Sequence, residues 1–340
     1  MALFVVLQIF APYFYKTNPN RLTKGILWIN YLALGTFACL FFYTLAADLV
    51  IGLWKILTQP ENDVAVEHTA FLVVSAMTLI SVLFGLLQTV RGPQVYEVTV
   101  PIKDLPQQFE GFTIAQISDL HLGAIIGKKY SKKVTQLTNS LTPDVVALTG
   151  DFVDGPVSQL HHAAAPLAQL QANHGVFFVT GNHEYYAGAQ QWINEFARLG
   201  MRVLLNEHVT IQKDDAELVL AGVTDPVSKH GANLVASNLQ KSVQNAPSNT
   251  VKILLAHRPS VCNEAAKAGF QLQLSGHTHG GQFFPWSIMV KLAEHYYKGL
   301  YKCQHMWLYV NRGTGYWGPP LRFLNSAEIT LLKLQRSPSA

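Results

Sequence analysis

Two long apolar stretches without charged residues dominate the first 90 positions of the chain. No charged residue occurs from Gly25 to Ala47, and none occurs over the 22 residues from Thr69 to Val90. A helix needs about 20 apolar residues to cross the hydrocarbon core of a bilayer. A buried core helix of a soluble domain rarely lacks charges over such a length. The pattern therefore predicts two transmembrane spans, at about residues 25–47 and 69–90.

A third apolar segment, Met1 to Tyr15, is shorter and is interrupted by Pro12. It lacks the basic start and the small-residue cleavage site of a signal peptide. A half-span, an interfacial segment and the remainder of a longer first helix all stay open for it. The membrane region is expected to cover residues 1–92.

The charged residues around the two spans predict the orientation of the chain. Three basic residues precede the first span, namely Lys16, Arg21 and Lys24. The connector between the spans sets Lys55 against acidic residues that include Glu61, Asp63 and Glu67. Connectors rich in Lys and Arg stay in the cytoplasm, and Arg91 and Lys103 follow the second span. We therefore expect a multi-pass protein of the inner or cell membrane with its C-terminal domain in the cytoplasm.

After Gly92 and Pro93, strand-like and helix-like stretches alternate. Short apolar runs predict buried strands, and they lie at residues 112–117, 145–148, 176–179, 253–256 and 272–274. Further strands are expected at residues 96–100, 202–205, 218–221, 306–310 and 328–334, and helices at 130–140, 159–171, 190–199 and 260–268. Repeated strand–loop–helix units are typical of a layered α/β domain with ligands at the carboxyl ends of the strands. Residues 93–340 are expected to form this domain.

Oxygen- and imidazole-bearing side chains follow all five buried strands. They occur as Asp119-x-His121, Gly150-Asp151, Gly181-Asn182-His183-Glu184, His257 and Gly276-His277-x-His279. One such triplet alone is more often a turn, but five in succession predict a metal site. Carboxylate, amide and imidazole ligands suit hard to borderline divalent metals, and thiolates are not needed.

These five motifs, in this order and spacing, resemble those of the calcineurin-like metallophosphoesterases. The resemblance covers roughly residues 95–334. It implies a four-layer α/β/β/α sandwich, preceded here by the transmembrane helices. It also implies two divalent metal ions, for which the ligand types fit manganese, iron or zinc.

The resemblance also assigns a role to each motif position. Asp119, His121 and His279 would hold one metal. The second metal would be held by Asn182, His257 and His277. Asp151 would bridge the two metals.

His183 would act on the substrate, donating a proton to the leaving oxygen or stabilising its charge. A structural histidine bonded to a backbone carbonyl is the alternative for His183. Asp154 and Glu184 would orient neighbouring imidazoles. Arg258 and Tyr185 are candidate substrate contacts, although an ordinary structural ion pair would explain Arg258 equally well.

Composition limits the partners. The chain of 340 residues is 49% hydrophobic and 14% charged, with a net charge of +4. No basic stripe interleaved with aromatic residues is present, so nucleic acid is not an expected partner. The three cysteines lack the spacing of a disulfide framework. Trp286 to Tyr301 mixes aromatic residues with lysines, which favours a bilayer interface but also fits a helix packed on a core.

The expected function is a membrane-anchored hydrolase of phosphodiester or pyrophosphate bonds that uses two metals. Membrane spans together with Gly276-His277-Thr278-His279-Gly280-Gly281-Gln282 resemble the subgroup that hydrolyses UDP-2,3-diacylglucosamine in lipid A biosynthesis, a branch of lipid metabolism. A phosphatase or phosphodiesterase acting on another lipid, a nucleotide or a phosphoprotein is an alternative. A non-catalytic membrane scaffold that binds metal is an alternative of another class.

Overall fold

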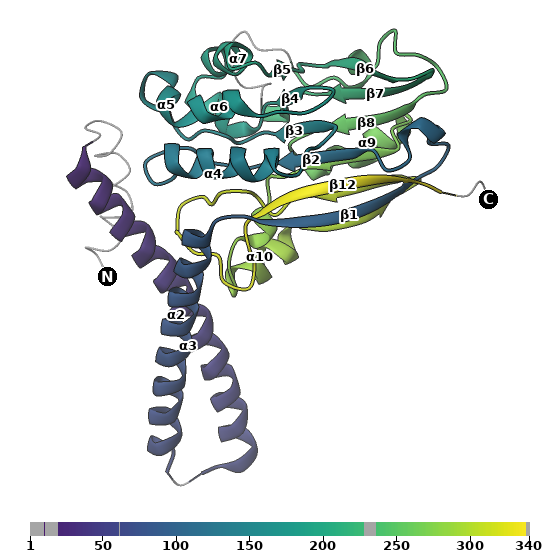
Figure 1. Ribbon diagram of the computed structural model, residues 1–340. Coiled ribbons are helices and arrows are strands. Elements are labelled where there is room, and N and C mark those ends of the chain that lie inside the picture. Colours follow the sequence, from purple (N-terminus) through teal and green to yellow (C-terminus); the bar gives the residue numbers. More distant parts are fainter. Residues whose placement is uncertain (1–9, 11–19, 61, 228–235, 338–340) are drawn as a thin grey trace. The chain divides into compact units, whose positions relative to one another are not determined.

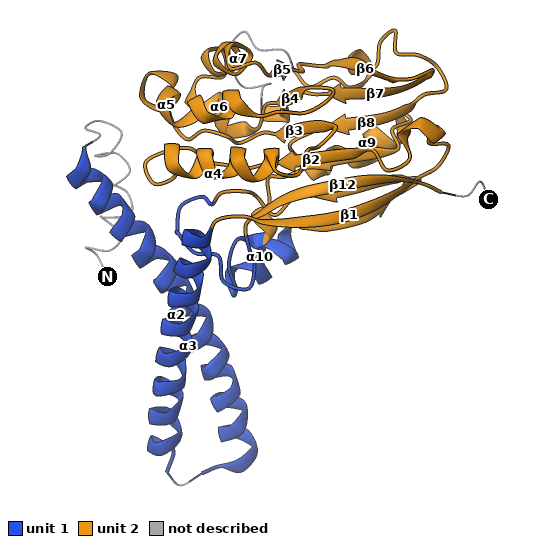
Figure 2. Ribbon diagram, in the orientation of Figure 1, with its two compact units in different colours: residues 1–91, 281–293, 316–326 blue, residues 92–280, 294–315, 327–340 orange. Residues whose placement is uncertain are grey.

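The computed structural model describes residues 10, 20–60, 62–227 and 236–337 (Figure 1). The apolar segment Met1 to Tyr15 lies outside the described residues except for Phe10. The chain forms two compact units (Figure 2). Unit 1 contains residues 1–91, 281–293 and 316–326, and unit 2 contains residues 92–280, 294–315 and 327–340.

Unit 1 is built on two long antiparallel helices, α2 (Arg21–Thr58) and α3 (Val64–Arg91). Asn20 caps α2 by accepting a hydrogen bond from the backbone N–H of Thr23, and Gln59 ends the helix in the left-handed conformation. Both helices are long and apolar enough to cross a membrane. They contain the two predicted spans, and α2 continues to Thr58 because its sequence has no helix breaker before Pro60.

Two later segments of the chain belong to the same unit. The first includes the short helix α10 (Trp286–Ala293), and the second is the loop Tyr316–Ser326. Leu321 of this loop is 1% exposed and lies in a cluster with Cys39 and Tyr43 of α2 and Val74 of α3. Part of the apolar surface of the hairpin formed by α2 and α3 is therefore covered by the loop Tyr316–Ser326.

Unit 2 consists of two six-stranded sheets. The first sheet has the order β1 (Gln94–Ile102), β12 (Glu328–Arg336), β2 (Thr113–Ile117), β3 (Val145–Thr149), β4 (Val176–Val179) and β5 (Arg202–Val203). The second has the order β10 (Gly299–Cys303), β11 (Met306–Val310), β9 (Leu272–Ser275), β8 (Val251–Leu255), β7 (Ala216–Gly222) and β6 (Glu207–Lys213). Strands β2 to β5 are mutually parallel, and so are β11, β9, β8 and β7.

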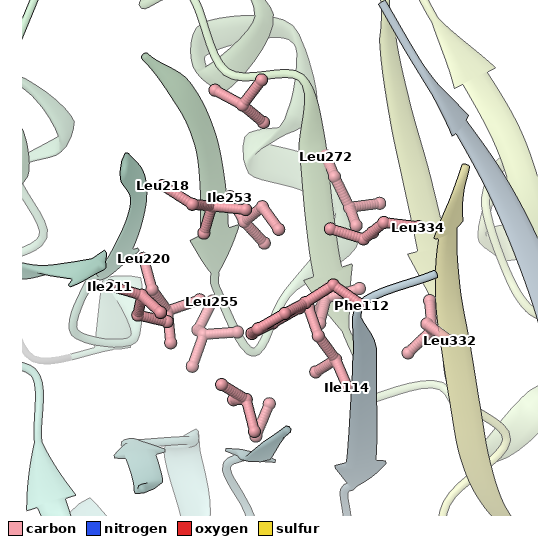
Figure 3. Packing of buried hydrophobic residues seen from close by; sticks show 14 of the residues in the cluster. Phe112, Ile114, Ile211, Leu218, Leu220, Ile253, Leu255, Leu272, Leu332 and Leu334 are labelled. Carbon is pink, nitrogen blue, oxygen red and sulfur yellow. The ribbon is translucent and has the colours of Figure 1, made fainter. Parts of the chain in front are cut away.

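Apolar side chains fill the space between the two sheets. Ile114 and Leu332 of the first sheet belong to one buried cluster with Leu220, Ile253 and Leu272 of the second (Figure 3). Strands that are buried on both faces read as continuous apolar runs, which explains why β2, β3, β4, β8 and β9 stand out in the sequence.

Helices cover the outer faces of the sheets. On the first sheet they are α4 (Lys128–Asn139), α5 (Val157–Ala164), α6 (Asn182–Ala187) and α7 (Ala189–Arg198). Phe196 of α7 packs on Phe178 of β4 with ring centroids 4.4 Å apart. On the second sheet, α9 (Cys262–Lys267) places Cys262, Ala265 and Ala266 in a cluster with strand residues. The predicted four-layer α/β/β/α sandwich is confirmed.

Candidate metal centre

The five predicted motifs meet at the carboxyl ends of parallel strands from both sheets. Asp119 and His121 follow β2, Asp151 follows β3, and Asn182 is the first residue of α6, just after β4. His257 follows β8, and His277 and His279 follow β9. Because parallel strands end at the same edge of a sheet, these loops lie side by side. Backbone hydrogen bonds of 2.9 Å join the Asp119 N–H to the Gly150 carbonyl and the Gly276 N–H to the His257 carbonyl.

Many of these residues have an unusual backbone conformation. Positive φ angles occur at Asp119 (52°), His121 (51°), Asp151 (57°), His277 (73°) and His279 (52°). A residue with a side chain held in the left-handed region costs of order 1–3 kcal/mol, and such residues cluster at functional sites. Sharp turns after the strands aim the side chains back toward one region.

One group of ligand-type atoms combines Asp119, His121 and His279. Their candidate ligand atoms lie within 4.8 Å of one another. His121 Nε2 is 3.0 Å from His279 Nε2, and His279 Nε2 is 3.5 Å from Asp119 Oδ1. The Asp119 carboxylate is completely buried and accepts the backbone N–H of His277 on both oxygens at 3.0 Å.

A second group combines Asp151, His257 and His277, again within 4.8 Å. His257 Nε2 lies 3.0 Å from Asp151 Oδ2 and 3.2 Å from His277 Nδ1. Asp151 Oδ1 accepts the backbone N–H of His183 at 2.8 Å. Burial, together with the positive charges of His257 and Arg258, lowers the pKa of His277 to about 3. A neutral imidazole is the form of histidine that binds metal.

Hydrogen bonds on the far side of two imidazoles fix which nitrogen faces the site. His257 Nδ1 is 2.8 Å from the Thr149 carbonyl, which accepts only, so Nδ1 carries a proton and Nε2 is the nitrogen that faces Asp151 Oδ2. His121 Nδ1 donates in the same way to Asp154 Oδ1 at 2.8 Å. This is how metal-binding histidines are oriented.

The residues present fit divalent metal ions. Two pairs of imidazole nitrogens face each other at 3.0 and 3.2 Å, and buried carboxylates lie beside both pairs. A mixed nitrogen and oxygen donor set of this kind suits manganese, iron or zinc. The described residues of these motifs offer no thiolate, because all three cysteines lie elsewhere in the fold.

His183 lies at the edge of the first group. Its Nδ1 is 2.8 Å from Asp154 Oδ1, the same oxygen that accepts from His121. Burial alone would raise the pKa of Asp154, but the imidazoles of His121 and His183 outweigh it and lower this pKa to about 2. A carboxylate is thus a hydrogen-bond partner of His183.

Glu184 holds the loops together. Its carboxyl group accepts the backbone N–H groups of Gly181 at 2.7 Å, Phe152 at 2.7 Å and Asp151 at 3.0 Å. Burial and the nearby Asp151 carboxylate raise the pKa of Glu184, although the three donors favour its ionised form. Glu184 therefore orients the backbone of the Asp151 loop, whereas Asp154 contacts the imidazoles that both residues were predicted to orient.

Arg258 reaches into the second group. Its Nε donates to Asp225 Oδ2 at 3.0 Å, and its two terminal nitrogens lie 3.2 Å from His277 Nε2 and from Asn182 Oδ1. Tyr185 is partly buried, with its hydroxyl group 3.1 Å from Thr180 Oγ1. Sequence analysis did not identify Asp225 as functional, although it follows β7 just as the ligand residues follow their strands.

The fold and the donor set together define a metal-binding α/β/β/α sandwich. A family model described as calcineurin-like phosphoesterase matches residues 112–281. A zebrafish (Danio rerio) protein, "Transmembrane protein with metallophosphoesterase domain", is 31% identical over 338 residues, covering 94% of this chain and 75% of that protein. The chain therefore belongs to the calcineurin-like phosphoesterase family, a family of phosphoester hydrolases that use divalent metals.

Two further similarities were found. A bovine (Bos taurus) protein with the same name as the zebrafish protein is 37% identical over 283 residues, covering 78% of this chain and 62% of that protein. Among solved structures, a putative 5'-nucleotidase from Staphylococcus aureus matches with a TM-score of 0.43 and 12% identity, covering 67% of this chain and 55% of that chain.

Proposed function

We propose that this chain is a membrane-anchored phosphoesterase with two metals that cleaves phosphodiester or pyrophosphate bonds. The observation that carries this proposal is the convergence of the two groups of ligand-type atoms described above. In this proposal Asp119, His121 and His279 hold one ion. The other ion is held by Asn182, His257 and His277, and Asp151 bridges the two.

Two divalent ions supply charge neutralisation at the phosphoryl oxygens and an activated water. The protein contributes the remaining groups. His183, with its Nδ1 bonded to Asp154, presents Nε2 to the leaving oxygen and donates a proton to it. Arg258, anchored by Asp225, binds a phosphoryl oxygen, since a guanidinium pairs well with phosphate. Tyr185 contacts the substrate beside them.

For the substrate, we propose the lipid pyrophosphate UDP-2,3-diacylglucosamine, which would place the enzyme in lipid A biosynthesis. The support is the combination of long apolar helices with the metal motifs, since a membrane anchor suits an amphiphilic substrate. We propose that the two ions are manganese, iron or zinc, which the mixed nitrogen and oxygen donor set suits. A multi-pass arrangement with the catalytic domain, residues 93–340, in the cytoplasm follows from the distribution of Lys and Arg.

The experiment is phosphorus NMR of detergent-purified protein with manganese and UDP-2,3-diacylglucosamine, with Asp151→Asn as the control for contaminating hydrolases. Release of UMP and the acylated sugar phosphate by the wild type alone supports the proposal. If only a generic aryl phosphodiester is cleaved, the lipid A assignment is wrong and another phosphoester is the substrate. If neither compound is cleaved while two metals are bound, the chain is a metal-binding scaffold.

The proposed topology has a separate test. A reporter enzyme that works only outside the cytoplasm is fused after Val90, at the end of α3. The proposal expects this fusion to be inactive. An active fusion would reverse the orientation without affecting the metal centre.

A further inference from the structure

The two later segments of unit 1, residues 281–293 and 316–326, have an unusual surface. Every residue of α10 is at least partly exposed. The exposed side chains of α10 are mostly large and apolar, namely Trp286 (45%), Ile288 (46%), Met289 (44%) and Leu292 (77%). The loop 316–326 adds Trp317 (56%) and Leu324 (72%). We call residues 281–293, which include α10, and the loop 316–326 together the wedge.

Hydrogen bonds join the two segments of the wedge to each other. The Gln282 side-chain amide donates to the carbonyls of Trp317 at 3.0 Å and Pro319 at 2.9 Å, and its oxygen accepts the Trp317 N–H at 2.8 Å. The Phe284 N–H donates to the Phe323 carbonyl at 3.0 Å. The two segments of the wedge therefore behave as one piece.

The wedge is also fixed to the helical hairpin. Leu321 fills a notch between two glycines, and a Cβ atom added at Gly35 or Gly85 would lie 2.5 or 3.1 Å from the leucine methyl groups. The Arg322 N–H donates to the Gly85 carbonyl at 3.1 Å. The Trp286 ring packs edge-on against Phe42, with centroids 6.4 Å apart. The exposed apolar surface is thus held at a defined height along the hairpin.

That height can be measured from the charged end of the hairpin. Lys55 forms ion pairs with Asp63 and Glu67 there. Eighteen residues separate Glu67 from Gly85, which is about 27 Å at 1.5 Å per residue. The hydrocarbon core of a bilayer is about 30 Å thick. If the charged cluster marks one boundary of the bilayer, Gly85 lies at the other.

Trp286 lies somewhat deeper. Its partner Phe42 is thirteen residues from Lys55, or about 20 Å along α2. The ring of Trp286 therefore sits about 10 Å inside the boundary, which is within the depth of 5–10 Å at which interfacial helices bury their apolar face. Lys291 on α10 is exposed, as expected for a helix that lies between lipid and water.

We propose that the wedge is a monotopic lipid-binding element that lies in one leaflet interface of the bilayer, with Trp286, Ile288, Met289 and Leu292 among the acyl chains. Its partner is the lipid of the membrane that the hairpin crosses. The inference rests on the proposed crossing by α2 and α3, and it is independent of the metal chemistry.

The test is spin labelling of the full chain in nanodiscs of phosphatidylcholine and phosphatidylglycerol. Single cysteines are introduced by Ile288→Cys and Leu292→Cys, and wild-type protein measures background labelling, because all three native cysteines are buried. Leu79→Cys is the control for a position inside the bilayer, because Leu79 lies in the middle of α3 and its side chain is 59% exposed on the surface of the hairpin. Gln136→Cys on the exposed face of α4 is the aqueous control. Circular dichroism confirms that each variant is folded.

Collision rates with oxygen and with a water-soluble nickel complex report the depth of each label. We expect the ratio of oxygen to nickel collisions at positions 288 and 292 to exceed that at 136 several-fold, with a depth of about 5–10 Å. If the labels at positions 288 and 292 are as accessible to the nickel complex as the label at position 136, while the label at position 79 lies deep in the bilayer, lipid binding by the wedge is wrong. The membrane crossing by α2 and α3 would not be affected. Exclusion of both reagents at 288 and 292 would indicate a protein partner, such as a second copy of the chain, and would also overturn it. A water-exposed label at 79 would refute the membrane crossing itself.

Discussion

The replacement Gly276→Ala tests how closely the loops of the metal centre are packed. A Cβ atom at position 276 would overlap Ser118 Oγ and Asp119 Oδ2 and lie 2.9 Å from Ser118 Cβ. Both neighbours are completely buried. To reach an ordinary contact distance, the Asp119 carboxylate would have to retreat by more than about 1 Å. It would then lose its hydrogen bonds to the His277 N–H.

The magnitude follows from this displacement. Overpacking a buried site costs about 1–3 kcal/mol, so the variant should still fold. Misplacing a catalytic group by about 1 Å can reduce the rate about 100-fold. We therefore expect Gly276→Ala to bind manganese more weakly and to hydrolyse an aryl phosphodiester about 100-fold more slowly.

The assay combines metal content by mass spectrometry, kcat and thermal unfolding. Gly127→Ala is the matched control, because Gly127 has an ordinary φ of −128° and a Cβ atom there meets nothing within 4 Å. Metal content and kcat within twofold of the wild type in the Gly276→Ala variant would refute the role assigned to this packing.

Three further replacements test other contacts. Asp154→Asn removes the carboxylate that accepts from both His121 and His183, and we expect a loss of about 10–100-fold in metal affinity or kcat; unchanged values would exclude this role. Asp225→Asn weakens the anchor of Arg258, so KM for a phosphodiester should rise more than kcat falls, and a pure kcat effect would contradict phosphate binding. Gly222→Ala would place a Cβ atom 2.5 Å from Leu204 Cβ, which should lower the free energy of unfolding by about 1–3 kcal/mol in denaturant titrations; a neutral change would show that the core adjusts.

The sequence predicted the ligand strands well because of their burial. Strands such as β3, with five buried residues out of five, leave an uninterrupted apolar run. The polar residue that ends such a run is conspicuous. Since β2, β3 and β4 are parallel neighbours, the residues after them had to meet at one edge.

Other parts of the fold left weaker patterns. The edge strand β6 alternates between buried Val209 and Ile211 and exposed neighbours, and it was not predicted. Helix α6 has only six residues, too few for a periodic pattern, yet it carries Asn182 and His183. Its start is fixed by Glu184, whose carboxyl group bonds to backbone groups more than 30 positions away.

The two later segments belong to unit 1 because of contacts between residues far apart in the sequence. Nothing in residues 281–293 or 316–326 by themselves shows that they belong with α2 and α3. The link is Leu321 in its notch between Gly35 and Gly85, positions more than 200 residues away. Asp225 was missed for a similar reason, because its importance lies in its contact with Arg258.

The central claim is that the five motifs hold two adjacent metal ions. Its most direct test is electron paramagnetic resonance of the full-length protein loaded with manganese, beside the Asp151→Asn variant. The account predicts two manganese ions per chain with the multiline spectrum of an exchange-coupled pair, and loss of that coupling in the variant. A six-line spectrum of isolated manganese, the same in wild type and variant, would contradict a shared site bridged by Asp151.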